Sequence, residues 1–190
     1  MELLNSISSW FSVWDTTRAL ALTSYLLLFV SMVAGILQSM KIMPPKSRAN
    51  LSIAHTLTGW LGLLFGVTHG LVLLYDTYVG YSIAEILIPF TAKKDPMEIG
   101  LGVIAMYIMF LLVLSSDLLK RLGKNVWRSV HYLAFPAFLM ALYHGVTIGT
   151  DTAIPGIKLM YIFTGLTVAV LVVLRINVSL KTKKKKQLLA

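Results

Sequence analysis

Residues 51–75 read LSIAHTLTGWLGLLFGVTHGLVLLY, an uncharged and almost wholly apolar run that carries two histidines, His55 and His69. A run of roughly 20 apolar residues is what an α-helix needs to cross the hydrocarbon core of a bilayer. Ionisable side chains are costly there, so an intramembrane histidine indicates a functional site. The other two histidines of the chain, His131 and His144, lie in a second run of the same kind.

The composition of the whole chain is that of a membrane protein. Of its 190 residues, 57% are hydrophobic and only 13% are charged, whereas soluble domains are far more polar. We therefore predict an all-α, polytopic helix bundle in the cell membrane, with the lipid bilayer around it. Despite the net charge of +9, we expect no nucleic-acid partner. The absence of cysteine excludes disulfides, zinc thiolates and cysteine-ligated iron–sulfur clusters.

Five apolar runs predict five transmembrane helices, at about residues 18–40, 51–75, 97–118, 126–149 and 157–178. Residues 1–17 lack the basic n-region and cleavage site of a signal peptide. They include Trp10, Phe11 and Trp14, and we expect them at the membrane surface, where tryptophan favours the headgroup level. The predicted organisation is thus a lead-in at 1–17, one five-helix domain at 18–178 and a basic cytoplasmic tail at 179–190.

Capping signals predict where these helices begin. Asp15 or Thr16 is expected to cap the first helix, and Asn50 the second. Asp95 precedes a proline and an acidic first turn, which predicts the start of the third helix.

The longest connection, residues 76–96, contains the signals of a short helix. Ser82 and Glu85 have the spacing of a capping box. Apolar residues then recur at i, i+3, i+4 and i+7, a pattern typical of a helix that lies on the membrane surface; they are Ile83, Ile86, Leu87 and Phe90.

The distribution of lysine and arginine predicts the orientation of the chain. The loops at 41–50 and 119–125 and the C-terminal tail carry most of these cations, while the opposite face has few of them and nearly all the acids. By the positive-inside rule, the first face is cytoplasmic, so the N-terminus lies outside and the C-terminus inside. His55 and His131 then lie near the cytoplasmic side, and His69 and His144 near the outer side.

The spacing within residues 51–75 is specific. The step from His55 to His69 corresponds to a rise of about 21 Å and a net rotation of about −40° on a helix, so both imidazoles face broadly the same way at two depths. Gly59, Gly62 and Gly66 fall on the same stripe. Such glycines permit close helix packing or expose bare backbone to a flat cofactor. We expect the second here, because histidines bound the stripe.

The second histidine run is less regular. The step from His131 to His144 rotates the second residue by about 140° from the first on an ideal helix. Pro136 lies between them, and an intrahelical proline kinks or retwists a helix, which offers a way to bring the two histidines into line. Phe135 and Phe138 share the face of His131 and would lie either beside a cofactor or in ordinary packing.

Two imidazoles that face each other across a gap, at each of two depths, can supply both axial ligands of two b-type haems. A bis-histidine iron has no open position and therefore favours electron transfer. Without cysteine no c-type attachment forms, so the two haems would be held non-covalently.

Three other interpretations compete with haem ligation. A lone intramembrane histidine is often only hydrogen-bonded to a neighbouring helix, although four of them at matching depths favour ligation. A small transporter would use histidines as proton relays, but such relays normally add intramembrane acids, and none lies well inside a span here. A cofactor-free structural or assembly subunit is the third alternative.

The two histidine spacings, on helices separated by one other helix, resemble the ferric reductase-like transmembrane domain superfamily. That superfamily includes NADPH oxidases, ferric reductases and the haem subunit of bacterial methionine sulfoxide reductase systems. Residues 127–132, WRSVHY, also resemble the W-R-x-x-H motif at the start of its second histidine helix. The likeness covers about residues 18–178.

This resemblance implies an inner haem iron held by His55 and His131 and an outer one held by His69 and His144. It also implies electron flow from the cytoplasm to the outside. Arg128, and more weakly Lys124 or Arg48, would neutralise the propionates of the inner haem through charge-assisted hydrogen bonds.

The chain also departs from the oxidases of that superfamily, since it contains no G-x-G-x-x-G motif or P-loop. We therefore expect no FAD or NAD(P)H site in it. It would be the haem-binding subunit of an oxidoreductase, with a separate cytoplasmic flavoprotein reductase or quinol as donor. The extracytoplasmic acceptor would be a ferric chelate, oxygen or a redox protein. The main alternative is a quinol-linked cytochrome b subunit that feeds a periplasmic reductase.

Overall fold

The structure is a computed structural model that describes residues 12–77 and 79–188. Within these residues every regular element is a helix, so the prediction of an all-α bundle is confirmed. The expectation that Trp10 and Phe11 lie at the membrane surface falls outside the described residues.

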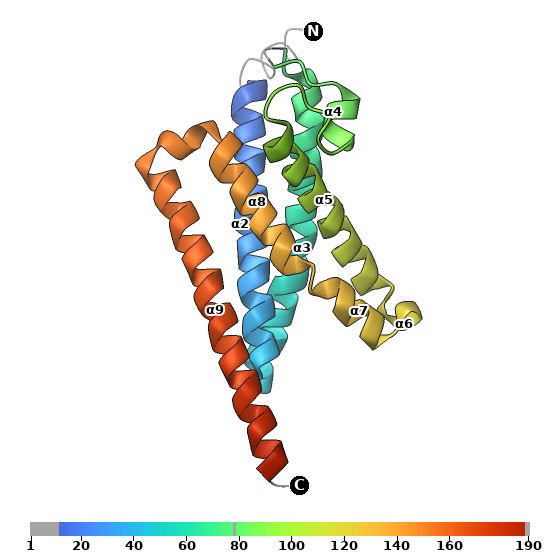
Figure 1. Cartoon of the computed structure of the whole chain (residues 1–190), viewed down its shortest axis with the longest axis vertical. Coiled ribbons are helices and arrows are strands. Elements are labelled where there is room, and N and C mark those ends of the chain that lie inside the picture. Colours follow the sequence, from blue (N-terminus) through green and yellow to red (C-terminus); the bar gives the residue numbers. More distant parts are fainter. Residues whose placement is uncertain (1–11, 78, 189–190) are drawn as a thin grey trace.

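Four long helices form the frame of the molecule: α2 (Val13–Met40), α3 (Pro45–Val72), α5 (Pro96–Asp117) and α9 (Pro155–Leu188). In Figure 1, α2 and α3 lie side by side along the long axis, with α5 on one side and α9 on the other. The start of α2 and the end of α9 lie at opposite ends of this axis. The connecting elements are η1 (Leu73–Tyr75), α4 (Ile83–Leu87), α6 (Leu119–Leu122), α7 (Lys124–His131), α8 (Ala134–Ile148) and η2 (Thr150–Ala153).

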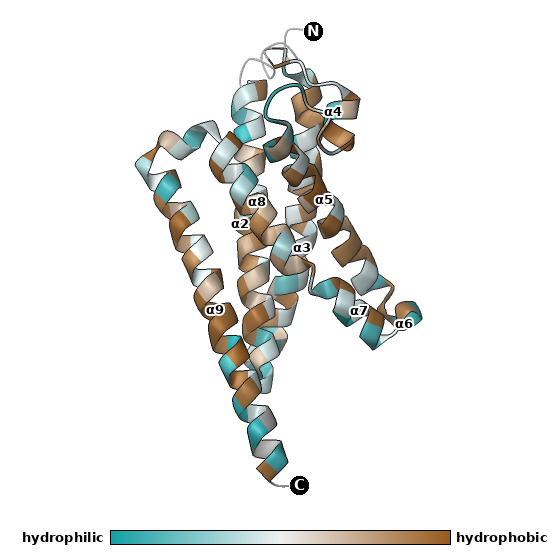
Figure 2. Cartoon of the chain, viewed as in Figure 1, coloured by the Kyte–Doolittle hydropathy of each residue, from teal (hydrophilic) through white to brown (hydrophobic). Residues whose placement is uncertain are grey.

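Four of the described helices are long and apolar enough to cross a membrane, namely α2, α3 together with η1, α5, and α9. Large apolar side chains on their outer faces are exposed, including Leu57, Leu64, Leu159 and Phe163. Figure 2 shows hydrophobic residues along α5 and α9 and hydrophilic residues at the lower end of α9 and around α6 and α7. Because the exposed flanks are apolar and the ends polar, the bundle is a membrane-embedded one.

The predicted fourth helix, residues 126–149, is not continuous. It is divided into α7, which ends at His131, and α8, which begins at Ala134. In an unbroken helix Pro136 would offer no N–H to the carbonyl of Tyr132, and its ring would clash with that carbonyl. The Tyr132 carbonyl instead accepts the N–H of Phe135 at 3.3 Å. The helix therefore restarts so that Pro136 lies in its first turn, where a missing N–H is tolerated.

This break affects the predicted number of spans. With 15 residues, α8 is shorter than the roughly 20 residues that cross a hydrocarbon core. A continuous fourth span was thus a wrong prediction, and a fifth crossing made by α7 and α8 together stays a prediction.

The first two helices begin earlier than predicted. Ser12 caps α2 by accepting the N–H of Asp15 at 3.0 Å, so neither Asp15 nor Thr16 is the cap. Helix α3 begins at Pro45, which places Asn50 inside the helix rather than at its cap. A proline suits the first helical position because its missing N–H would have no partner there.

The later helices also differ at their ends. Pro96 opens α5 with Glu98 in its first turn, as predicted, but the side chain of Asp95 makes no capping bond. Helix α9 runs from Pro155 to Leu188, well beyond the predicted end near residue 178. The described part of the basic tail is therefore a helical extension of the last span.

The predicted capping box on the outer loop is confirmed. The hydroxyl of Ser82 accepts the N–H of Glu85, and the Glu85 carboxylate accepts the N–H of Ser82 at 2.9 Å. The same carboxylate accepts the N–H of Lys93 at 3.1 Å, which ties the two halves of the loop together. The helix ends at Leu87, so Phe90, with a φ of 67°, lies beyond it and not on its face.

A small aromatic core joins α2, α8 and α9. The rings of Tyr25 and Phe138 stack at 5.8 Å between centroids, and Tyr161 packs on Tyr25 at 4.9 Å. The hydroxyls of Tyr25 and Thr164 are hydrogen-bonded at 2.6 Å. Phe138 thus takes part in ordinary helix packing, and Phe135 packs against the same cluster.

Candidate functional site

The four histidines gather in the interior between three helices. His55 and His69 lie on α3, His131 is the last residue of α7, and His144 lies on α8. None of the four rings is fully exposed. The structure therefore brings together residues that the sequence places in two distant runs.

The two histidines predicted to lie on the inner side form a direct pair. The ring centroids of His55 and His131 are 5.7 Å apart, and the ring planes are inclined by 71°. A face of the His131 ring is covered by Trp127, whose ring stacks on the imidazole at 4.8 Å and 28°.

The two histidines predicted to lie on the outer side line one cavity, which is named the outer cavity. Its volume is about 540 Å³, and both His69 and His144 contribute to its wall. Most of the wall is apolar, with residues from α2, α3, α5 and α8. This volume falls in the range of about 300–1,000 Å³ that is typical of small-molecule and cofactor sites.

Three of the four imidazoles are held by a backbone carbonyl. The Nδ1–H of His55 donates to the carbonyl of Ser31 at 2.9 Å. The Nδ1–H of His69 donates to the carbonyl of Thr17 at 3.0 Å, and that of His144 to the carbonyl of Glu98 at 2.9 Å.

These bonds fix the tautomer of each ring. A carbonyl only accepts, so Nδ1 must carry the proton, and the lone pair is on Nε2. Among the described residues, Nε2 of these histidines makes no hydrogen bond. Metal-ligating histidines almost always donate their other ring N–H in this way, so the arrangement suits a metal bound at Nε2.

Two glycines make room for imidazole rings. A Cβ atom at Gly35 on α2 would lie 3.1 Å from Cε1 and Nδ1 of His55. A Cβ atom at Gly102 on α5 would lie 2.7 Å from Nδ1 of His144, closer than real Cβ contacts come. The His144 ring therefore occupies space that only a glycine leaves open, whereas the His55 ring would have to shift slightly to admit a methyl group at Gly35.

The predicted glycine stripe on α3 faces α2. The atoms nearest to an added Cβ are Ser31 Oγ for Gly59, Leu28 for Gly62 and Ser24 Oγ for Gly66. Close packing of α3 against α2 therefore accounts for glycine at these three positions. Gly62 and Gly66 also line the outer cavity, whereas Gly59 is not part of its wall. Their predicted contact with a cofactor stays a prediction.

The cations suggested for the inner site lie in different settings. Arg128 and Lys124 are exposed on α7. Arg48 is half-buried in the first turns of α3, and its Nε atom is buried without a hydrogen-bond partner in the described part of the chain. Buried polar atoms normally have a hydrogen-bond partner; the predicted role of Arg128, and more weakly of Lys124 or Arg48, toward a propionate stays a prediction.

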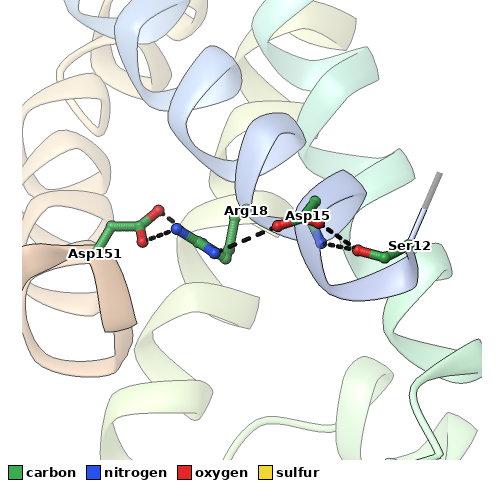
Figure 3. Close-up of polar contacts among 4 residues, drawn as sticks. All are labelled: Ser12, Asp15, Arg18 and Asp151. Atoms are coloured by element: carbon green, nitrogen blue, oxygen red, sulfur yellow. Dashed lines mark hydrogen bonds and ion pairs between the residues drawn. The ribbon is translucent and has the colours of Figure 1, made fainter. Parts of the chain in front are cut away.

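An ion pair forms between two residues in the wall of the cavity. Arg18 on α2 donates from Nε to Asp151 in η2 at 2.8 Å, and a second bond joins the same two side chains. Figure 3 shows Arg18 between Asp151 and Asp15, with Ser12 beyond them. Both Arg18 and Asp151 line the cavity. The sequence did not predict this ion pair, because nothing in the loop that carries Asp151 indicates its partner.

No group of three or more histidine, cysteine or acidic side chains is placed to hold a metal ion in residues 12–77 and 79–188. A haem iron needs only two ligands from the protein, because the macrocycle supplies the rest. Pairs of histidines are therefore the relevant arrangement for such an iron.

The comparison with protein families gives one match. The family model described as "Ferric reductase like transmembrane component" matches residues 19–142, which is more than half of the chain and contains three of the four histidines. No curated protein and no solved structure matches the chain. On the strength of the family match, the chain belongs to the ferric reductase-like transmembrane family.

Proposed function

We propose that this chain is the haem-binding subunit of a transmembrane electron-transfer system. Two b-type haems are held non-covalently, one between His55 and His131 and one between His69 and His144. The observation that carries the proposal is the set of Nδ1–H bonds to backbone carbonyls, which leaves Nε2 of three partly buried imidazoles free for an iron. Family membership supports the same function.

The separation of the inner pair fits one metal ion. A bond between a metal and an imidazole nitrogen is about 2.0–2.1 Å long. Two such bonds, with roughly 1.15 Å from each nitrogen to its ring centre added, give about 6.4 Å, so the His55 and His131 rings, 5.7 Å apart between centroids, would move apart by less than about 1 Å to hold one ion.

The outer cavity fits a flat, mostly apolar group. Its volume of about 540 Å³ and largely apolar wall match that need, and Gly66, Gly102 and Gly145 are among its lining residues. The polar groups of such a ligand would face Arg18 in the cavity wall. When bound, haem supplies one-electron chemistry, while the protein holds the iron, excludes water and sets the local electrostatics.

The orientation completes the proposal. The chain is embedded in the plasma membrane, and α7 and α8 together make its fifth crossing. The N-terminus lies outside the cell and the C-terminus in the cytoplasm. Electrons enter near His131 from a cytoplasmic flavoprotein and leave near His144 for an extracytoplasmic acceptor. Arg128, one turn before His131 on α7, and Arg48, whose Nε is buried without a partner in the described residues, are the proposed donors to an inner propionate.

The experiment is the absorption spectrum of the detergent-purified protein before and after dithionite. We expect a sharp low-spin b-type band with two haems per chain; a protein that binds no haem in cells or on reconstitution would refute the proposal. His55→Ala and His131→Ala should abolish one haem, and His69→Ala and His144→Ala the other. Leu64→Ala, on the lipid-facing side of α3, is the matched control and should retain both.

Stopped-flow reduction distinguishes the donors. If a flavoprotein reductase with NAD(P)H reduces the haems and a quinol does not, the flavoprotein-linked form is supported. Rapid reduction by quinol alone would instead support the quinol-linked cytochrome.

A further inference from the structure

One of the four histidines is held differently from the others. His131 Nδ1 is buried and has no hydrogen-bond partner among the described residues, whereas the other three Nδ1 atoms each meet a backbone carbonyl. The helix that carries His131 ends at that residue. No hydrogen bond therefore limits rotation of this ring.

A flat aromatic contact takes the place of the missing bond. The Trp127 ring lies on the His131 imidazole with centroids 4.8 Å apart and planes inclined by 28°. Trp127 is itself held, because its Nε1–H donates to the hydroxyl oxygen of Ser116 at 3.2 Å. The Ser116 hydroxyl in turn donates to the carbonyl of Leu112 on α5 at 2.9 Å. The stack thus connects His131 to the end of a neighbouring helix.

We infer that Trp127 is a positioning residue that sets the plane of the His131 imidazole by stacking, in the role that backbone carbonyls have for the other three histidines. The Ser31 carbonyl fixes the ring plane of His55 on α3 by accepting its Nδ1–H, and on α7 Trp127 fixes the ring plane of His131 by stacking. The part of this inference that concerns a haem iron rests on the proposed function.

The two ligands of the inner iron are then chemically unequal. An acceptor at the distal ring N–H makes an imidazole a more basic ligand. His55 has such an acceptor in the Ser31 carbonyl, and His131 lacks one. Because axial-ligand basicity and orientation set the properties of a haem iron, changing Trp127 should alter the inner haem and spare the outer one.

The test compares Trp127→Leu, Trp127→Phe and Ser116→Ala in the haem-loaded full chain. Trp60→Leu is the matched control, because Trp60 is exposed on α3. The readouts are the low-spin EPR signal and the midpoint potential of each haem, with the inner haem identified as the one lost in His131→Ala. We expect Trp127→Leu to shift both quantities for the inner haem alone, Trp127→Phe to restore them, and Ser116→Ala to give a smaller shift.

Three results would overturn the inference. They are an unchanged inner haem in Trp127→Leu, equal changes in both haems, and a Trp127→Phe variant that behaves like Trp127→Leu.

A further measurement, by solid-state NMR, does not depend on haem. In haem-free protein with labelled histidine and tryptophan, a solid-state NMR cross peak should join the Trp127 and His131 rings, and its absence would refute the stack. Failure of the wild type to bind haem would refute the proposed function, while this cross peak still decides the role of Trp127.

Discussion

The imidazoles of His55 and His131 face each other from α3 and α7, with 5.7 Å between their centroids and 71° between their planes. The two helices are separated in sequence by the whole of α5, so this relationship is produced by tertiary packing. It brings the two rings into edge-to-face contact.

Gly102→Ala should disturb the outer site more than Gly35→Ala disturbs the inner one. The added methyl would lie 2.7 Å from the His144 ring in the first case and 3.1 Å from the His55 ring in the second. We expect Gly102→Ala to lose most of the outer haem and Gly35→Ala to retain the inner haem with a shifted band. Haem content and reduced spectra check this. Gly156→Ala, which meets nothing within 4 Å, is the control, and a Gly102→Ala protein with wild-type spectra would contradict the geometry.

Substitutions that keep the anchoring carbonyls should be tolerated. His69 is bonded to the backbone oxygen of Thr17, and the Thr17 hydroxyl is buried without a partner in the described structure. Thr17→Val preserves the carbonyl and removes an unsatisfied polar atom, so it should raise the free energy of unfolding by about 1 kcal/mol. Thermal unfolding and the outer-haem spectrum provide the measurement; loss of the outer haem would show that the side chain matters instead.

Asp151→Asn should loosen the outer end of the bundle. The Asp151 side chain is only 14% exposed and forms two bonds with Arg18, whereas that of Asp15 is 73% exposed and lies 3.4 Å from Arg18. Breaking a shielded pair costs more than breaking an exposed one. We therefore expect a fall in Tm of several degrees for Asp151→Asn and little change for Asp15→Asn. A partial recovery in the charge swap of Arg18→Asp with Asp151→Arg would identify the pair as the cause, and equal Tm values for both single variants would argue against it.

The outer loop should open only in acid. Hydrogen bonds from the Ser82 N–H, the Ser82 hydroxyl and the Lys93 N–H lower the pKa of Glu85 from 4.5 to about 2. Because the folded pKa is depressed, the stabilisation is fully present above the unfolded pKa and is lost as pH falls from about 4.5 towards 2. The hydrogen-exchange protection factors of residues 82–93, corrected for the intrinsic rate at each pH, should stay high at neutral pH and fall below about pH 4. Glu85→Gln should exchange faster at neutral pH, and a transition centred near pH 6 would exclude Glu85 as its source.

Local signals in the sequence predicted local structure well. The spacing of Ser82 and Glu85 predicted the capping box that the structure contains, because both partners lie within one turn. Apolar runs predicted the long helices for the same reason. The break after His131 was missed because a proline is compatible with either a kink or a restart. The choice depends on how α8 packs against α5 and on the core around Phe138.

The sequence predicted those aspects of the function that depend on residue type and spacing. Four histidines in two apolar runs indicated an intramembrane site, and their spacing gave the resemblance to the family that the comparison confirms. The groups that hold the rings were not predictable. Every residue has a carbonyl, so nothing in the sequence marks Ser31, Thr17 and Glu98 as acceptors.

The sequence by itself determined that this is an all-helical membrane protein with two histidines in each of two apolar runs, because hydropathy and helical period act over neighbouring residues. Only the tertiary structure decided that Gly35 and Gly102 lie against the imidazoles and that Trp127, rather than a carbonyl, contacts His131. Those contacts join different helices. Their geometry follows from how the helices cross and from where α7 ends, and no local pattern encodes either.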